Sequence, residues 1–283
     1  MRAGEPVAIL AGGGRLPFLV GAAAAKAGRE PIVIAIAGEA EPAGFAPFPV
    51  HPLHWGEIGR LFRLLEESGC REAVLIGGIL KRPDFRAIRP DLGAVKLIPR
   101  ILRLMRGGDN GLLRGVARIF EDHGVRILSP LDVAPELALP EGLLIGGADA
   151  ADARHDIDQA LDAARAIGRL DVGQGAVAVR GRVVATEDAD GTDALLQRVA
   201  ILRESGRIAK TGGVLVKCLK PQQDRRLDLP TIGPETAAGA RLAGLDGVAA
   251  EAGRALLAGR GETVDAFRRA GLFLAGLKPT DPS

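Results

Sequence analysis

The sequence predicts an α/β protein with a Rossmann-like parallel sheet in its N-terminal half and a separate α/β domain in its C-terminal half. In the first half, short apolar runs of buried-strand type alternate with segments of helical periodicity, which is the pattern of a parallel, doubly wound sheet. Prolines then cluster at Pro130, Pro135 and Pro140, and the mixed hairpin and helix signals that follow differ from those before. The alternation therefore predicts the fold class, and the prolines predict the division into two domains.

We place the domain boundary at this proline cluster. Residues 1–130 are expected to form the N-terminal domain, residues 131–140 a proline-rich linker, and residues 141–283 the C-terminal domain. A chain of 283 residues is long enough for two ordinary domains that each bury a core.

The N-terminal half opens with a predicted βαβ unit. Residues 7–10 are a short apolar run that ends at Gly12-Gly13-Gly14, and residues 16–27 are expected to form a helix that Gly28 terminates. Residues 32–36 are a β-branched run of buried-strand type. A strand, a glycine-rich turn, a helix and a second strand in this order are typical of a βαβ unit.

The remaining elements follow from the same kinds of signal. In the first half we expect a helix around residues 58–65, a strand at 73–76 that Gly77-Gly78 closes, helices around 94–105 and 112–123, and a strand at 125–128. In the second half we expect a helix from His155, a hairpin of 177–179 with 183–185, a helix after Thr192, strands at 214–218, 245–249 and 272–274, and helices at 234–243 and 264–270.

Composition narrows the classes of protein to which the chain belongs. The formal net charge of +2 is too small for a bulk nucleic-acid binder, and the 3% of aromatic residues, with no Tyr, argue against stacking platforms for single strands. Cys70 and Cys218 have neither metal-ligand spacing nor a disulfide framework, which fits a reducing cytoplasm. The start shows no signal peptide, and no window holds the roughly 18 to 20 apolar residues of a membrane span. We therefore expect a soluble or peripheral protein.

The densest ionisable chemistry follows the predicted strand at 214–218. Between this strand and the helix that Pro234 opens lie two lysines, two arginines, two carboxylates and a hydroxyl: Lys217, Lys220, Arg225, Arg226, Asp224, Asp228 and Thr231. Such a loop suits the binding of an anion. A solvated, charged loop without a ligand explains the same residues equally well.

Three segments carry a resemblance to a known family. They are AGGGRLP at residues 11–17, IGRLDVGQGAVAV at 167–179 and KCLKPQQDRRLDLPTIG at 217–233, and the likeness extends from about residue 6 to about residue 275. In this order they resemble the two-domain, magnesium-requiring UDP-2,3-diacylglucosamine pyrophosphatases of bacterial lipid A synthesis, as distinct from the metallophosphoesterases that perform the same step. The resemblance implies hydrolysis to UMP and 2,3-diacylglucosamine 1-phosphate (lipid X). It also implies a nucleotide-binding N-terminal domain, a catalytic and acyl-binding C-terminal domain, and a substrate cleft between them.

The resemblance also singles out candidate residues. Asp228 falls on the aspartate that it marks as essential for hydrolysis, and Asp224 is a nearby second carboxylate. We expect both as catalytic residues and as ligands of Mg²⁺, since this cation prefers carboxylate oxygens. The alternative role for Asp228 is that of a base toward water. The expected substrate-binding residues are Gly12, Gly13, Gly14, Arg15, Gly77, Gly78, Gly191, Thr192, Lys217, Lys220, Arg225 and Thr231.

Each group in this set has a structural alternative. The glycine pairs follow predicted strands that would share one sheet edge, where backbone amides approach a phosphate, but strand-to-helix turns use glycine without any ligand. Thr192 would bind substrate or merely cap its helix. One or two of Lys217, Lys220 and Arg225 are expected to be ordinary surface charges. Asp190 stands where the family usually has Glu, which leaves a metal role for that carboxylate in doubt.

Other functions stay open at this point. A nucleotide-binding oxidoreductase is disfavoured, because Gly12-Gly13-Gly14 is followed by Arg15-Leu16-Pro17 and the third glycine of the dinucleotide fingerprint is missing. Another nucleotide-diphosphate-sugar enzyme or a non-catalytic nucleotide or lipid carrier would use the same residues. His51 and His54 are at most half of a metal site. For the family function we expect a cytoplasmic protein of a Gram-negative bacterium, peripheral on the inner face of the cytoplasmic membrane, with no nucleic-acid partner and with a homodimer left open.

Overall fold

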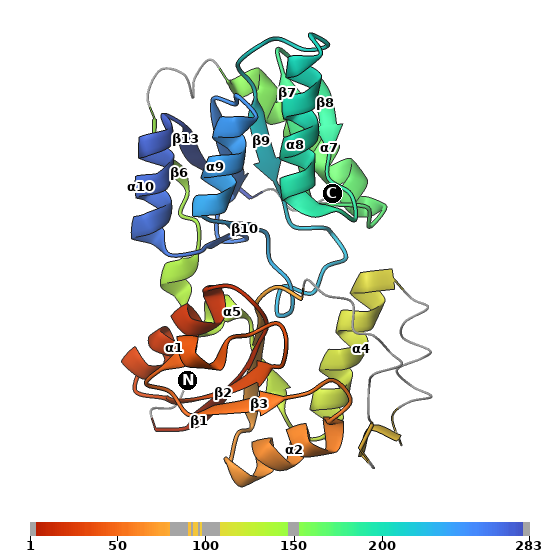
Figure 1. Ribbon diagram of the computed structural model, residues 1–283, viewed down its shortest axis with the longest axis vertical. Helices are drawn as coiled ribbons and strands as arrows, with labels where there is room; N and C mark the ends of the chain where they lie inside the picture. The colour runs from red at the N-terminus through yellow and green to blue at the C-terminus, as the bar shows by residue number, and fades with distance from the viewer. Residues whose placement is uncertain are drawn as a thin grey trace. The chain divides into compact units, whose positions relative to one another are not determined.

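The computed structural model divides the chain into two compact units (Figure 1). The first unit is Met1–Glu136 with Asp224–Asp228, and the second is Leu137–Gln223 with Leu229–Ser283. The structure describes residues 4–79, 90–91, 93–95, 97, 108–146 and 153–279. The predicted helix around 94–105 lies mostly outside these residues. One short segment of the charged loop thus belongs to the first unit, although the sequence places it in the second half of the chain.

The sheet of the first unit is parallel throughout. Its strand order is β3-β2-β1-β4-β5, and each neighbouring pair is parallel. The strands are β1 (Pro6–Ala11), β2 (Glu30–Ile36), β3 (Val50–Leu53), β4 (Glu72–Ile76) and β5 (Arg126–Ile127). This is the strand order of a Rossmann-like sheet, whose switch point lies between β1 and β4. The predicted parallel sheet is confirmed.

Helices and a hydrophobic core complete the first unit. The helices are α1 (Leu16–Lys26), η1 (Pro42–Phe45), α2 (Ile58–Glu67), α4 (Gly108–Asp122), α5 (Pro130–Val133) and η2 (Pro135–Leu137), the last of which runs into the second unit. Buried side chains of β1, β2, β4, α2 and α4 form one cluster, and Leu227 of the charged loop packs against it. Leu227 is partly buried by this packing, which helps to explain why the short segment around it folds with this unit.

The stretch expected as a linker contains ordered turns. It includes α5 and η2, and Ser129 caps α5 by accepting a hydrogen bond from the amide of Leu131 at 3.3 Å. Asp132 completes a capping box by accepting from the amide of Ser129 at 3.0 Å. Pro130 and Pro135 therefore each open a short helical segment, whereas Pro140 lies outside these segments.

The second unit is built on a six-stranded mixed sheet. Its order is β6-β13-β11-β9-β7-β8, and β13, β11 and β9 are parallel at its centre. The strands are β6 (Gly142–Ile145), β7 (Gly175–Val179), β8 (Arg182–Thr186), β9 (Val214–Lys217), β11 (Gly247–Glu251) and β13 (Phe273–Leu277), with a separate pair β10 (Thr231–Ile232) and β12 (Leu256–Leu257). The hairpin predicted around Arg180-Gly181 is the antiparallel pair β7–β8.

Helices cover both faces of this sheet (Figure 1). Buried side chains of α8 (Gly191–Glu204), α9 (Pro234–Leu242) and α10 (Arg260–Ala270) share a core with one set of strand residues. Those of α7 (Arg154–Arg169) share a core with the alternate residues, such as Ala178 and Val216. Because successive strand residues face opposite sides of a sheet, α7 covers one face and the other three helices cover the second. The fold class predicted for the second half is confirmed.

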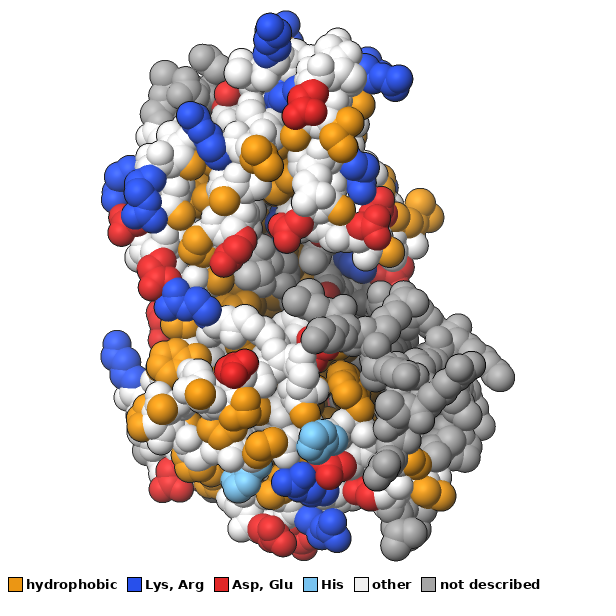
Figure 2. All heavy atoms as spheres, in the orientation of Figure 1, with side chains coloured by type: hydrophobic (Ala, Val, Ile, Leu, Met, Phe, Trp, Pro, Cys, Tyr) orange, Lys and Arg blue, Asp and Glu red, His pale blue; other side chains and the backbone are white. Residues whose placement is uncertain are grey.

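The surface carries charges of both signs. On the face shown in Figure 2, Lys and Arg side chains are interspersed with Asp and Glu and with hydrophobic side chains. The large exposed hydrophobic residues of the second unit include Leu170, Ile201 and Leu242, with 75%, 61% and 73% of their surface accessible. Within the described residues, no helix has the length and apolarity that crossing a membrane requires.

Candidate active site

The glycines at the carboxyl ends of β1 and β4 lie against each other. Gly13 and Gly78 form an isolated antiparallel bridge, in which the Gly13 amide donates to the Gly78 carbonyl at 2.7 Å and the Gly78 amide to the Gly13 carbonyl at 3.0 Å. The Gly12 amide donates to the carbonyl of Ile76 at 2.9 Å. The sequence placed both turns at one sheet edge, and the parallel pairing of β1 with β4 confirms this placement.

Contact between the two turns by itself explains why two of these positions are glycine. A Cβ atom on Gly12 would lie 2.6 Å from the Gly78 carbonyl oxygen, and one on Gly77 would lie 2.7 Å from the carbonyl carbon of Gly12. Gly77 also has φ +104, a conformation that L side chains rarely adopt. These positions require glycine whether or not a ligand binds.

Gly14 and Arg15 differ from this pair. Gly14 has φ +89, but a Cβ there would meet nothing within 4 Å, and both residues are exposed. Arg15 is the N-cap of α1 and makes no side-chain capping bond. The exposed start of α1, with the positive end of its dipole, is therefore the part of this edge that suits an anionic ligand.

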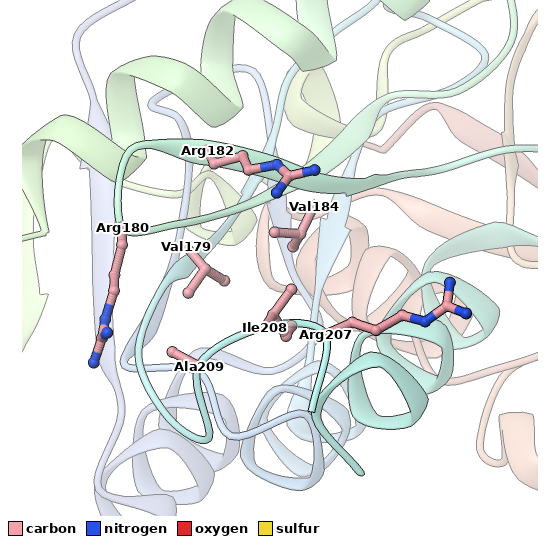
Figure 3. A pocket seen from close by; sticks show the side chains of 7 residues that line it. All are labelled: Val179, Arg180, Arg182, Val184, Arg207, Ile208 and Ala209. Atoms are coloured by element: carbon pink, nitrogen blue, oxygen red, sulfur yellow. The ribbon is translucent and has the colours of Figure 1, made fainter. Parts of the chain in front are cut away.

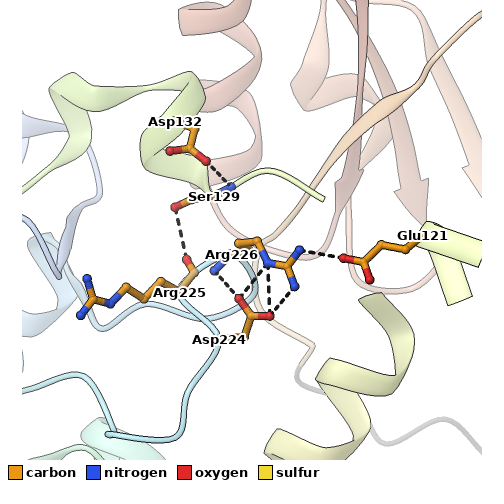
Figure 4. A network of polar contacts seen from close by, with 6 residues as sticks. All are labelled: Glu121, Ser129, Asp132, Asp224, Arg225 and Arg226. Atoms are coloured by element: carbon orange, nitrogen blue, oxygen red, sulfur yellow. Dashed lines mark hydrogen bonds and ion pairs between the residues drawn. The ribbon is translucent and has the colours of Figure 1, made fainter. Parts of the chain in front are cut away.

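The loop Asp224–Asp228 is held on the first unit by a polar network (Figure 4). The guanidinium of Arg226 donates to both carboxylate oxygens of Asp224, at 2.7 to 3.2 Å, and to Glu121 at 2.8 Å. The hydroxyl of Ser129 donates to the carbonyl of Arg225 at 3.2 Å. The loop is thus anchored by side chains and backbone as well as by Leu227.

These contacts separate the two candidate carboxylates. The hydrogen bond from Arg226 is the main cause that lowers the pKa of Asp224 below its usual value, and the backbone amide of Arg226 adds a further bond at 3.0 Å. Asp224 is thereby engaged by one arginine through both oxygens, which leaves little of it for a cation. Asp228 is half-buried, and its amide donates to the carbonyl of Asp224 at 3.2 Å.

A dedicated protein cage for a metal is not found in the described part of the chain. No group of three or more His, Cys, Asp or Glu side chains there is placed to hold a metal ion, and this includes His51 and His54. Mg²⁺ commonly binds through only one or two carboxylates together with substrate phosphates and water. A site with Asp228 as a protein ligand fits that pattern, and the contacts of Asp224 with Arg226 are what count against a site that both carboxylates share.

A second group of site residues lies in the second unit, at the end of β9. The ammonium of Lys217, a residue that is only 5% exposed, donates to the hydroxyl of Thr192 at 2.9 Å and to the carbonyl of Thr231 at 3.2 Å. The Thr192 hydroxyl in turn donates to Glu187 at 2.7 Å. Three predicted substrate-binding residues, Thr192, Lys217 and Thr231, are therefore brought together.

Thr192 does not act as the helix cap that the sequence allowed. Helix α8 begins at Gly191, and its N-cap residue Asp190 makes no side-chain capping bond. Thr192 is the second helical residue, and its hydroxyl points to Lys217 and Glu187 through the bonds just described. The capping alternative is wrong because the N-cap is Asp190, two residues earlier than expected, and the first-turn amides of α8 have no side-chain cap from Asp190.

The other predicted cations have different surroundings. Lys220 forms an ion pair with Asp171 at 2.8 Å, and Arg225 is exposed. Cys218 is buried, and burial raises the pKa of its thiol to about 12, in keeping with the core position expected for it. Lys217 is thus the cation of this set that is buried among candidate site residues.

Sequence reasoning missed Glu187 and Gln174. Glu187 is 5% exposed and accepts a hydrogen bond from the amide of Gln174 at 3.0 Å. The side-chain oxygen of Gln174 is buried and has no hydrogen-bond partner in the described part of the chain. The only signal was that Gln174 lies in the family-like segment 167–179, to which no role had been given.

A hollow in the second unit lies elsewhere (Figure 3). It has a volume of about 240 Å³ and is lined by Val179, Arg180, Arg182, Val184, Arg207, Ile208 and Ala209. Its apolar side chains face one another, while Arg180 points away. Lys217 pairs with Gly175 at the start of β7, whereas the hollow lies at the turn that follows β7. The hollow therefore contains no candidate site residue.

Comparisons with known proteins agree with the order of the segments. The model of the LpxI N-terminal domain matches residues 6–137, and that of the LpxI C-terminal domain matches residues 140–275. The UDP-2,3-diacylglucosamine pyrophosphatase LpxI of Caulobacter vibrioides is 42% identical over 275 residues, which cover 96% of this chain and 98% of that protein. A solved structure, glycinamide-RNase-transformylase T from Mycobacterium tuberculosis, is 16% identical, and the match covers 65% of this chain and 44% of that protein. Its TM-score of 0.24 is too low to support any argument.

Proposed function

The chain belongs to the LpxI family, and from this membership we propose that it hydrolyses the pyrophosphate bond of UDP-2,3-diacylglucosamine. The products are UMP and 2,3-diacylglucosamine 1-phosphate: the oxygen of water bonds to one phosphorus, the bond from that phosphorus to the bridging oxygen breaks, and the protons of water pass to the phosphate products and solvent. The observation that carries the proposal is 42% identity, over nearly the full length of both chains, to a pyrophosphatase of that name. The protein is accordingly a hydrolase of lipid A biosynthesis.

Asp228 is the carboxylate that we assign to the reaction. Asp228 would hold Mg²⁺, which would neutralise charge on the non-bridging phosphate oxygens. Asp228 is suited to this role because its position in the turn is set by the backbone bond to Asp224 and by the packing of Leu227. Asp224 acts on the loop through Arg226, so its part is to hold the turn in place.

Lys217 and Thr192 are suited to bind the anionic part of the substrate. Lys217 contributes a positive charge beside the first turn of α8, where backbone amides and the helix dipole favour negative charge. A phosphate at this position would receive hydrogen bonds from amides near Gly191 and Thr192. Loss of either side chain is expected to weaken binding of the diphosphate and of its transition state together.

The glycine edge of the first unit is suited to the nucleotide. Gly12, Gly13, Gly77 and Gly78 keep the two turns close, and Gly14 with Arg15 exposes the start of α1. The backbone there approaches a ligand without side chains in the way. We therefore assign uridine phosphate contacts to Gly14 and Arg15 and a supporting role to the other glycines.

Association with the inner face of the cytoplasmic membrane belongs to the same proposal. The substrate carries two acyl chains, and residues such as Ile201 and Leu242 expose most of their apolar side chains to solvent. Such residues, together with basic side chains, are suited to contact a membrane surface. We also propose a homodimer, which size-exclusion chromatography with light scattering tests.

The experiment is phosphorus NMR of UDP-2,3-diacylglucosamine with the purified protein. We expect UMP and the lipid 1-phosphate to appear in Mg²⁺ and not in excess EDTA. An Asp228→Asn sample with an unchanged far-UV circular dichroism spectrum should turn the substrate over about a thousandfold more slowly. No turnover by the parent protein in Mg²⁺ would overturn the proposed function. Turnover in ¹⁸O-labelled water then shows, by isotope shift, which phosphorus is attacked.

A further inference from the structure

We infer that Glu187 is a positioning residue for this reaction, which orients Thr192 and through it Lys217, and that the segment around Gln174 exists to hold this carboxylate. The inference rests on the proposed function. It assigns a role to a buried acid that the family resemblance did not single out, and a reason to the family-like segment 167–179.

The first step is the direction of the hydrogen bonds. The Thr192 hydroxyl has a single proton, and it is donated to Glu187 at 2.7 Å. A lone pair of the same oxygen is then available to the Lys217 ammonium at 2.9 Å. Without the carboxylate, the hydroxyl is free to rotate, and the position of Lys217 is no longer specified by this bond.

The second step is the charge. Lys217 lies next to the second residue of α8, at the positive end of the helix dipole, where a cation is disfavoured. The negative charge of Glu187 in the same cluster offsets this effect while no substrate is bound. An anionic phosphate offsets it in the complex. The carboxylate therefore holds the lysine in a place where it gains from binding an anion.

The third step is how Glu187 is itself held. One carboxylate oxygen accepts from Thr192, and the other accepts from the amide of Gln174 at 3.0 Å. The Glu187 amide donates to the carbonyl of Gly175 at 2.8 Å. A buried carboxylate needs such partners, because burial without them is strongly unfavourable.

The glycines on either side of Gln174 make the approach possible. A Cβ atom on Gly173 would lie 2.3 Å from the Glu187 carbonyl oxygen, and one on Gly175 would lie 3.0 Å from its carboxylate. Neither glycine has a positive φ, so space and not backbone conformation is what requires them. The Gly-Gln-Gly sequence thus leaves the space that Glu187 occupies.

The test is a double-mutant cycle of Glu187→Gln with Lys217→Met, measured as kcat/KM in the phosphorus assay. The glutamine has the same shape, but it carries no charge and presents an NH₂ group in place of one acceptor oxygen. We expect Glu187→Gln alone to lower kcat/KM at least about tenfold, since small displacements of binding groups have effects of this order or larger. In the Lys217→Met background we expect almost no further decrease. An equal decrease in both backgrounds, or none in either, overturns the inference.

Three further variants keep the inference testable if Glu187→Gln folds poorly. Thr192→Val removes the hydroxyl and should lower kcat/KM as Glu187→Gln does, whereas Thr192→Ser keeps it and should restore most of the activity. A Thr192→Val protein with parent activity would contradict the chain of bonds. The matched control is Glu72→Gln, which takes a carboxylate from Arg29 and Arg126 in the first unit and should leave kcat/KM unchanged.

Binding of UDP, which carries the diphosphate, is measured by titration calorimetry and separates this inference from the proposed function. If the parent does not turn over the substrate, but UDP binding is weakened by Glu187→Gln and not weakened further in the Lys217→Met background, the positioning role stands and the proposed reaction falls. If UDP binding and turnover are both independent of Glu187, the positioning role falls and the reaction stands or falls on its own assay.

Discussion

The carboxyl ends of the parallel strands carry different chemistry in the two units. In the first unit, β1 and β4 end in glycines, and the close contacts there join backbone atoms of Gly12, Gly13, Gly77 and Gly78. In the second unit, β9 and β11 end in Lys217 and Glu251, which are 5% and 3% exposed and bind other side chains. Both edges are places where ligands collect in such sheets.

The difference teaches how each edge is held together. Glycines carry no charge and let two backbone segments approach closely, but they lose more conformational entropy on folding than other residues. Buried ionisable groups need partners, which Lys217 has in Thr192 and Glu251 has in Arg165 at 2.7 Å. Substitutions that add volume should therefore have their main effect at the first edge, and substitutions that remove charge should have theirs at the second.

The largest expected effect concerns the loop that the first unit holds. We expect Asp228→Asn to lower kcat by a factor of about a thousand, because electrostatic groups at the reacting centre contribute on this scale. Asp224→Asn, the matched change, should lower it far less, since Asp224 is engaged by Arg226. Steady-state kinetics in saturating Mg²⁺ measure both. Equal decreases in kcat from the two variants would indicate that Asp224 also binds the metal.

Added volume at the glycine edge gives the next effect. Gly77→Ala should lower the free energy of unfolding by about 3 kcal/mol, from a positive φ and from contact with the Gly12 backbone. Gly14→Ala has a positive φ but open space, so its loss should be about 1 kcal/mol. Urea denaturation of both variants gives the comparison. A Gly14→Ala loss as large as that of Gly77→Ala would mean that volume is not the deciding factor.

Lost charge at the second edge should act on activity. Lys217→Met is expected to lower kcat/KM by about tenfold to a hundredfold, because it removes a charged hydrogen-bond donor from the proposed anion site. Lys220→Met removes a lysine already paired with Asp171 and should change kcat/KM about threefold or less. The two variants are compared in the phosphorus assay. A greater decrease in kcat/KM from Lys220→Met than from Lys217→Met would place the anion site at Lys220 instead of Lys217.

The smallest effect is the pH dependence of the Asp224 network. The hydrogen bond from Arg226 lowers the pKa of Asp224 in the folded state, so its stabilisation is present above the unfolded pKa of about 3.9 and is lost as pH falls through the lower folded value. Asp224→Asn should therefore cost about 1 kcal/mol at pH 7, and the difference from the parent should shrink below about pH 4. Urea denaturation at several pH values measures it, with Glu121→Gln as a control that keeps the Asp224–Arg226 bonds. A difference independent of pH would exclude the charge as its cause.

Periodic patterns explain most of what was predictable in the fold. Apolar runs separated by glycines located β1, β2 and β4, and the β7–β8 hairpin followed from apolar runs flanking Arg180-Gly181. Thr192 was misjudged as a possible cap because a hydroxyl at the start of a helix has two local uses that the sequence does not distinguish. Asp224 was expected to share a metal with Asp228 because the two lie close together in the chain. Proximity in the chain does not show that Arg226 engages Asp224.

The sequence by itself determined the family, the parallel sheet of the first half and the residues of the charged loop, because these depend on local order and period. Only the tertiary structure decided that Lys217 meets Thr192, 25 residues away, and that Gln174 and Glu187, 13 residues apart, share a hydrogen bond. It also decided that Leu227 takes its short segment to the core of the first unit. Such contacts depend on the pairing and register of distant segments, which bring together side chains that no local pattern relates.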